Sequence, residues 1–489
     1  MSSKADSDLE KASDPVLVSD FSGADNVVDW DANDPSNPHN WTSGKKWQHI
    51  ILVSLLALVT NMGPTTCAAG INQIVHEFRI ASDTLSTLAI TIYVLGLALG
   101  PMFISPLSEV YGRLPVYHGA VIVFLTFLLG TALSQTTTQF MVFRFFSGAM
   151  GGVPMALGGG TIADLTSPAE RATAMALFSL GPLTGPVLGP LLGGFIAGGA
   201  GWRWTFWFLV ILGGTIEIAC IIFMRETHPS VILERKAARL RVSTGNPKWE
   251  SKLTRANVTP QQVLIQALVR PTMLLIRSPI LFIISLYVAV VFGTMYLLFT
   301  TFVPVFEGQY GFTTTVSGLT YLGLGIALLT AMVTFTLVSN RIQTTRMKKE
   351  GLQQPRPEYR LLLMIVFSPL VGLGLFLYGW TTEYKVHWIV PIIGTFVTGF
   401  GAYFVLMPAQ LYLIDLFGST GAASALGANN LLRSVASTFL PLAGPPMYDR
   451  LGYGWGNTLL GFLALAFVPG PILFYKFGER IRAKSQVQM

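Results

Sequence analysis

The sequence predicts an all-α membrane protein with twelve transmembrane helices in two six-helix bundles. The 489 residues are 51% hydrophobic and 12% charged, with a mean hydropathy of +0.55, whereas about a quarter of a soluble domain is charged. Twelve apolar segments are long enough for a ~30 Å hydrocarbon core, which needs about 20 residues. One long polar stretch separates the first six segments from the last six.

The expected organisation is a polar tail (1–47), a first bundle (48–224), a basic linker (225–278), a second bundle (279–476) and a short tail (477–489). The expected spans are 48–69, 85–106, 116–134, 138–163, 171–197, 204–224, 279–303, 316–338, 360–379, 387–412, 419–443 and 454–476.

The distribution of basic residues predicts the orientation. The net charge is +7, but with both tails assigned to the cytosol, 26 of the 32 Lys and Arg residues fall on the cytosolic side and four on the other. This asymmetry follows the positive-inside rule and argues against nucleic acid as the partner. The basic linker is either a solvated tether or a segment lying along the anionic cytosolic leaflet.

The loop between the second and third spans contains an unusual charged turn, residues 105–113. Gly112 permits the tight turn, and Glu109 and Arg113 are four residues apart, so they can pair across it. The turn is either an ordinary loop that sets orientation or a contact that forms when the cytosolic side closes.

The fourth span has small residues every four positions, which predicts a groove for close helix packing. Arg144 begins this groove and Asp164 ends it. A charge inside the membrane is costly and usually faces a wet cavity or a partner. Arg144 is therefore either a functional residue or a buried structural arginine bound to carbonyl groups.

The fifth span repeats Gly-Pro with a period of four. Proline removes amide donors and kinks a helix, while glycine allows tight packing, which we expect against the other half. The repeat comprises Gly181, Pro182, Gly185, Pro186, Gly189, Pro190, Gly193 and Gly194.

These three motifs together resemble the major facilitator superfamily, and within it the fungal twelve-span drug:proton antiporters of the DHA1 type. The turn is similar to the superfamily's loop motif, with Ser105 in place of the first Gly, Glu109 in place of Asp and Leu114 in place of the usual Lys. Arg144 followed by Gly148 resembles the fourth-helix motif. The Gly-Pro repeat resembles the antiporter signature, with Pro190 replacing its last Gly.

The resemblance implies two bundles related by pseudo-symmetry and gives the charged residues roles. Glu109 would face the start of the eleventh helix, near Ser419, when the cytosolic side is closed. Arg144 would take part in proton coupling or substrate binding. In the second half, Asn340 and Arg341 would occupy a loop equivalent to the charged turn. The implied cytosolic latch comprises Glu109, Gly112, Arg113, Asp164 and Arg171.

The proton carrier and the substrate cavity are less defined. Glu217 is the one clear carboxylate in the middle of a span, and it is either a proton carrier or a structural partner of Arg144 or another polar group. Cavity candidates are aromatic and amide side chains suited to bulky amphiphiles. They are Asn61, Tyr296, Phe299, Tyr321, Tyr403 and Gln410. Packing or lipid contact is the alternative role for most of the aromatic residues.

The leading functional hypothesis is a monomeric proton-coupled exporter of amphipathic organic molecules in the plasma membrane, or alternatively the vacuolar membrane. Other readings are a polyamine exporter, a proton-coupled importer and a sensor that keeps the fold without transport. An enzyme is not expected, because the sequence has no His-Glu-x-x-His or Gly-x-Ser-x-Gly motif and no Walker loop. We expect no cofactor or metal, and Cys67 and Cys220 lie within apolar spans.

Overall fold

The structure, a computed structural model, describes the chain except residues 1–25, 32, 254–259, 352–355 and 485–489. The first described elements are β1 (Val27–Val28) and η2 (Pro38–Asn40). The first half then contains α2 (Ser43–Thr66), α3 (Ile71–Phe78), α4 (Asp83–Ile104), α5 (Leu107–Tyr111), α6 (Arg113–Ala132), α7 (Thr137–Leu165), α8 (Pro168–Ala200) and α9 (Trp202–Phe223).

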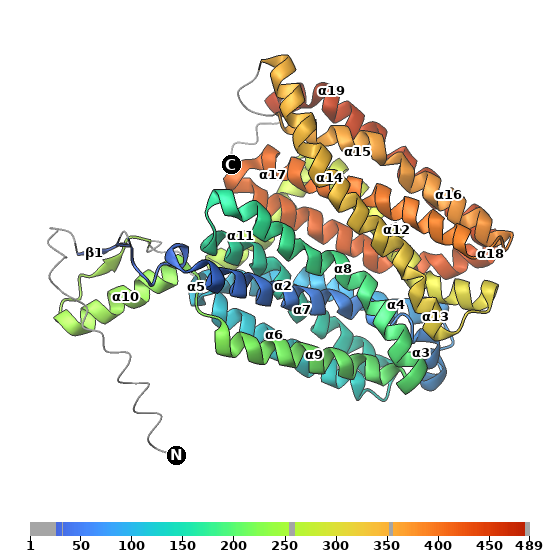
Figure 1. The fold of residues 1–489 in the computed structure, drawn as a ribbon, viewed down its shortest axis with the longest axis horizontal. Coiled ribbons are helices and arrows are strands. Elements are labelled where there is room, and N and C mark those ends of the chain that lie inside the picture. Colours follow the sequence, from blue (N-terminus) through green and yellow to red (C-terminus); the bar gives the residue numbers. More distant parts are fainter. Residues whose placement is uncertain (1–25, 32, 254–259, 352–355, 485–489) are drawn as a thin grey trace.

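The linker and the second half follow (Figure 1). The linker contains α10 (Pro229–Thr244), β2 (Glu250–Ser251) and α11 (Pro260–Arg277). The second half contains α12 (Pro279–Tyr310), α13 (Thr314–Leu319), α14 (Tyr321–Glu350), η3 (Pro357–Arg360), α15 (Leu361–Phe367), α16 (Pro369–Glu383), α17 (Ile389–Phe439), η4 (Leu440–Ala443), α18 (Gly444–Ala466) and α19 (Pro469–Lys484).

The predicted all-α membrane fold is confirmed. Eleven stretches of the described residues are long and apolar enough to cross a membrane, and the last, Gly421–Gly478, is 58 residues long. The backbone leaves helical geometry at Gly452 (φ 71°, ψ 177°), so this stretch accounts for the last two expected spans. Gly418 (φ 61°, ψ −167°) interrupts α17 in the same way between the tenth and eleventh spans.

The prediction of a loop directly after the eighth span is wrong. Helix α14 continues to Glu350, so Asn340 and Arg341 lie inside a helix and not in a turn. Nothing in the polar run interrupts helical geometry before Gly351, which has a left-handed backbone (φ 65°). Hydropathy marks where a helix leaves the lipid, but helix propensity and capping decide where it ends.

The bundle has two ends, which we call the linker face and the opposite face. The linker face carries α5, α10 and α11, and the opposite face carries α3 and α13 (Figure 1). Near the opposite face two hydrogen bonds join the halves: Thr91 Oγ1 donates to Thr438 O (3.0 Å), and Asn72 Nδ2 donates to Glu307 Oε2 (2.7 Å). The linker face is the predicted cytosolic side.

Side chains of neighbouring helices bind backbone carbonyls that proline leaves free. Pro64 has no amide to donate to Thr60 O, and the Tyr93 hydroxyl donates to that carbonyl instead (2.7 Å). Pro190 likewise cannot bind the Pro186 carbonyl, which accepts from Thr65 Oγ1 (3.1 Å). These bonds make proline tolerable inside membrane helices.

The described part of the N-terminal tail packs on the linker. Strand β1 pairs in parallel with β2, and buried Val28 contacts the apolar face of α10. Lys236 on α10 binds Asp31 (3.1 Å) and Asp34 (2.9 Å) in the tail. Burial opposes the charge of Lys236, but these two carboxylates outweigh it and raise its pKa. The tail therefore anchors the first part of the linker.

Candidate functional site

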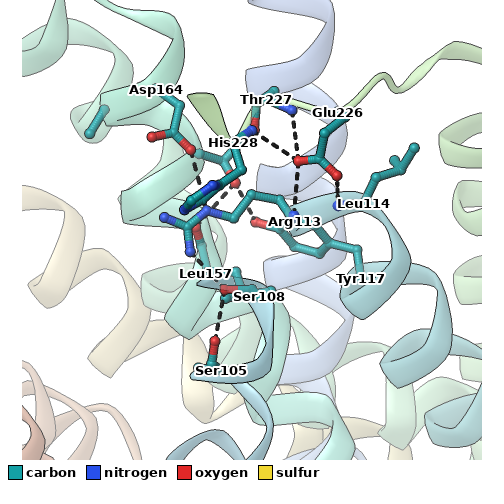
Figure 2. Close-up of polar contacts among 12 residues, drawn as sticks. Ser105, Ser108, Arg113, Leu114, Tyr117, Leu157, Asp164, Glu226, Thr227 and His228 are labelled. Atoms are coloured by element: carbon teal, nitrogen blue, oxygen red, sulfur yellow. Dashed lines mark hydrogen bonds and ion pairs between the residues drawn. The ribbon is translucent and has the colours of Figure 1, made fainter. Parts of the chain in front are cut away.

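Arg113 is the centre of a polar cluster at the linker face (Figure 2). It is the first residue of α6, and its Nε donates to Asp164 Oδ2 (3.3 Å) while Nη1 donates to Ser108 Oγ (2.7 Å). Gly160 makes room for the guanidinium, because a Cβ there would lie 2.7 Å from Nη2. The cluster ties α5, α6 and α7 together within the first half.

Glu226, which the sequence analysis missed, completes this cluster. Its carboxylate accepts backbone hydrogen bonds from Arg113 (2.9 Å) and Leu114 (3.2 Å) at the start of α6. It also accepts from the amides of Thr227 (3.0 Å) and His228 (2.9 Å). A carboxylate at a helix N-terminus binds amides that have no partner within the helix and interacts favourably with the helix dipole.

Gly112 is required at this point for two reasons. Its φ of 99° is unfavourable for residues with a side chain. A Cβ there would also collide with Glu226 Oε2. The one signal for Glu226 in the sequence is an acid directly after the sixth span, and more than a hundred residues separate Glu226 from Arg113 and Leu114.

Two predicted latch residues lie at the edge of the cluster. Glu109 is exposed in the first turn of α5. Arg171 donates to the carbonyls of Ala163 (3.4 Å) and Thr166 (3.5 Å), so it binds the C-terminal end of α7. A contact between Glu109 and the helix after Gly418 stays a prediction.

Arg144 is fully buried, its guanidinium lies 4.9 Å from the centroid of the Tyr93 ring, and its described hydrogen bonds all go to backbone carbonyls. Its Nη1 donates to Gly63 O (2.6 Å), and its Nη2 donates to Pro64 O (2.9 Å) and Ile90 O (2.8 Å). A longer bond joins Nε to Ala89 O (3.3 Å). Gly63 and Pro64 are in the last turn of α2, where carbonyls lack intrahelical partners and a cation is favoured.

The Gly-Pro repeat in α8 packs mainly within its own half. Cβ atoms at Gly181 and Gly185 would come within 2.6 Å of Ser54 O and 2.9 Å of Asn61 Cβ, both in α2. Pro190 and Gly194 approach the second half: a Cβ at Gly318 would lie 2.7 Å from Pro190 O, and a Cβ at Gly194 would lie 3.2 Å from the α carbon of Gly318. The expected packing against the other half is therefore found only near the end of the repeat, because the period of four places Gly181, Gly185, Gly189 and Gly193 along α2.

Glu217 pairs with His118, a residue that the sequence analysis also missed. His118 Nδ1 lies 2.6 Å from Glu217 Oε1, which joins α6 to α9. Glu217 is 3% exposed, and its Oε2 has no hydrogen-bond partner among the described residues. The structure thus connects Glu217 to another polar group and not to Arg144.

The cavity candidates fall into separate groups. One aromatic cluster in the second half contains Tyr296, Phe299 and Tyr321. The ring centroid of Phe299 lies 5.5 Å from that of Tyr296 and 5.9 Å from that of Tyr321. Arg433 lies 4.6 Å from the centroid of the Phe292 ring beside this cluster. Its Nη2 donates to Asn430 Oδ1 (2.8 Å) on the same helix.

The other three candidates lie apart from this cluster. Asn61 is buried in α2, and its amide donates to Ala57 O (2.8 Å). Tyr403 contacts Phe335, with ring centroids 6.1 Å apart, and Gln410 is half-buried further along α17. Whether these side chains bind substrate stays a prediction.

Comparison with known proteins identifies the family. A family model described as Major Facilitator Superfamily matches residues 51–441. The chain belongs to the major facilitator superfamily. Solved structures of the D-xylose-proton symporter (TM-score 0.64, 16% identity, covering 87% of this chain and 98% of that one) and of the inward-open E. coli xylose transporter XylE (0.64, 15%, 88% and 96%) share the superfamily fold.

Fungal members of the superfamily are much more similar in sequence. The MFS transporter prlG of Fungal sp. (strain NRRL 50135) is 51% identical over 462 residues, covering 94% of this chain and 97% of that protein. The trichosetin biosynthesis cluster MFS transporter of Gibberella fujikuroi is 46% identical over 465 residues, covering 95% and 90%. The chain is therefore similar over nearly its whole length to fungal transporters of this superfamily, one of which is named for a biosynthesis cluster.

Proposed function

We propose that this protein is a proton-driven antiporter that exports amphipathic small organic molecules, such as secondary metabolites, toxins or drugs. The observation that carries the proposal is an identity of 46–51% along nearly the whole chain with fungal transporters, one of them named for a biosynthesis cluster. The Gly-Pro repeat, which resembles the antiporter signature, supports export over import.

Alternating access of the two halves is the proposed mechanism. The halves are joined near the opposite face by Thr91 with Thr438 and by the close approach of Gly194 to Gly318. The cluster around Arg113 lies at the other end and joins helices of one half. This arrangement supports a first half that moves as a unit while contacts between the halves exchange.

Glu217 is the proposed proton acceptor, with His118 as its partner. The carboxylate is buried, one oxygen is 2.6 Å from an imidazole nitrogen, and the other is unpartnered among the described residues. Such a pair can take up and release a proton without breaking a contact between helix backbones. Arg144 ties α2 to α4, so its role in coupling would be to hold these two helices in place around the transport path.

The test is transport of a labelled panel of amphiphiles and polyamines into inside-out vesicles with an imposed pH gradient. We expect gradient-dependent accumulation of an amphiphile by the wild type. Glu217→Gln should lose accumulation against a gradient but keep downhill exchange. Asp83→Asn, which changes an exposed carboxylate at the start of α4, is the matched control and should keep both. Equal flux with and without the pH gradient would contradict proton coupling.

We also place the linker face in the cytosol, and the protein in the plasma membrane as a monomer. The excess of Lys and Arg in the linker and tails supports this orientation. Val242 on α10 is 86% exposed, so a cysteine there should react with an impermeant reagent only after the cells are permeabilised. Labelling in intact cells would mean that the linker face is outside the cell, contrary to the proposed orientation.

A further inference from the structure

Helix α11 has an apolar stripe that the described part of the chain leaves open. Ile265, Val269, Met273 and Ile276 are 58%, 47%, 41% and 79% exposed. Their spacing of four, four and three residues, at about 100° per residue, places them within an arc of about 80°. Four large apolar side chains on one face of a helix are unfavourable in water.

The other side of α11 packs on the bundle. Leu274 is buried in the core of the second half, and Pro271 is buried against Gly427, at 3.6 Å from a Cβ placed there. Arg270 and Arg277 are exposed. Measured around the helix axis from Ile265, they lie at about 120–140°, between the open stripe and the packed side. The helix therefore has an apolar outer face bordered by arginines.

The position of α11 relates this face to the membrane. Only Ser278 separates α11 from α12, which begins at Pro279 and is long and apolar enough to cross the membrane. The helix lies at the linker end of the bundle (Figure 1). It contacts α4 and α5 of the first half as well as α12 and α17 of the second. The stripe is thus at the level where the transmembrane helices enter the bilayer.

We propose that α11 lies in the headgroup–acyl boundary of the linker-face leaflet, with its apolar stripe among acyl chains and Arg270 and Arg277 bound to phosphates of anionic lipids. Helices that lie in the membrane interface have an apolar face in the acyl boundary and basic residues at its edge. The proposal does not depend on antiport or on export. Lipid fits better than a protein partner because the stripe leads directly into the membrane-crossing helix.

The other linker helix behaves differently, which gives an internal control. Helix α10 packs its apolar face on the N-terminal tail, and Lys236 is bound there. Its exposed valine, Val242, stands alone, and Arg235 and Arg239 are exposed to solvent. We therefore expect α10 to remain in water while α11 lies in lipid.

The first test measures the surroundings of α11 directly. The two native cysteines, Cys67 and Cys220, are buried and are replaced by alanine in the full-length protein. A spin label is then attached at Met273→Cys, and the protein is placed in phosphatidylcholine–phosphatidylserine nanodiscs. The label should be accessible to oxygen and protected from a water-soluble nickel relaxation agent. A label at Val242→Cys should show the opposite. Equal accessibility of both labels to the nickel agent would overturn the proposal.

The second test addresses the arginines. A fluorophore at Met273→Cys is quenched by spin-labelled phosphatidylserine or phosphatidylcholine, and the ratio measures the preference for anionic lipid. Each Arg near an anionic surface contributes about 1 kcal/mol, or about fivefold, so Arg270→Gln with Arg277→Gln should lower the preference by up to about 30-fold. Arg235→Gln with Arg239→Gln removes the same charge from α10 and should leave the preference for anionic lipid unchanged. Equal losses, or no loss in the α11 variant, would contradict phosphate binding by α11.

Discussion

Each half of the molecule has an ion pair at the linker face, between a residue at the start of its third transmembrane helix and one near the end of its fourth. Arg113 pairs with Asp164 at 3.3 Å in the first half, and Arg360 pairs with Asp415 at 3.0 Å in the second. The side chains of the first pair are 16% and 14% exposed, and those of the second are 20% and 34% exposed. The first pair also has Glu226 binding the amide of Arg113.

The buried arginines of the two halves differ in the same way. Arg144 binds carbonyls of α2 and α4, whereas Arg433 binds Asn430, three residues away on its own helix. The hydrogen bonds of Arg144 therefore join two helices, whereas those of Arg433 stay within one helix. Arg113 and Arg360 correspond in the two bundles, whereas Arg144 lies in the fourth helix of its half and Arg433 in the fifth.

The largest expected difference concerns the buried arginines. Arg144→Met leaves the carbonyls of Gly63 and Pro64 without a donor, and each unsatisfied buried acceptor costs about 1–3 kcal/mol, so we expect a loss of about 2–6 kcal/mol. Arg433→Met should cost less, because Asn430 loses one local partner. Thermal unfolding in detergent, followed by size-exclusion chromatography, measures both. Equal losses would contradict the proposed difference between the halves.

A smaller difference is expected at the linker face. Glu226→Gln removes the charge that binds four backbone amides and should cost about 2 kcal/mol, because hydrogen bonds to charged groups are worth about 1.5–3 kcal/mol. Asp415→Asn weakens a more exposed ion pair, for which about 0–1 kcal/mol is typical. The same thermal assay compares them. A larger loss for Asp415→Asn would mean that Glu226 is not the anchor of α6.

The contact between the halves should be weaker still. Asn72→Ala removes the donor to Glu307 Oε2 across the opposite face, which is worth about 1 kcal/mol, or about fivefold in the balance of open and closed forms. Distances between spin labels on α3 and α13 report that balance. Ser86→Ala, within α4, is the control and should leave the distances unchanged.

The smallest expected effect concerns pH at the opposite face, where a carboxylate binds the start of the last helix of each half. Glu77 accepts from the Trp202 indole (2.7 Å) and Arg203, and Glu383 accepts from the amide of Tyr453 (2.7 Å). Partial burial opposes the charge of Glu77, but the hydrogen bonds from Arg203 and Trp202 outweigh this effect and lower the pKa of Glu77.

The lowered pKa sets the sign of the pH dependence. Glu77 stabilises the fold above its usual pKa of about 4.5, and the contribution is lost as pH falls through its lower value in the protein. The exposed pair should contribute less than about 1 kcal/mol. The wild type should therefore be thermally more stable than Glu77→Gln at neutral pH, and this difference should disappear in acid. An advantage that grows in acid would contradict this assignment.

Much of the fold was predictable because lipid imposes a strong pattern. Segments of about 20 apolar residues and one long polar linker predict the bundles without any knowledge of contacts. Helix ends were less predictable, as α14 shows by continuing to Glu350. The Gly-Pro repeat predicted close packing, but it could not identify α2 as the partner, because small residues indicate close approach and not which helix approaches.

The charged site was predictable only where its residues are near in sequence or form a recognised motif. The amino-acid pattern alone was enough to identify the membrane class, the two halves and the positions of Arg113, Arg144 and Asp164, because charged residues inside or next to apolar spans are rare. The tertiary structure decided their partners. Glu226 meets α6 and His118 meets Glu217 only after distant helices pack together, and hydrogen bonds require a few ångströms of proximity that sequence spacing does not specify.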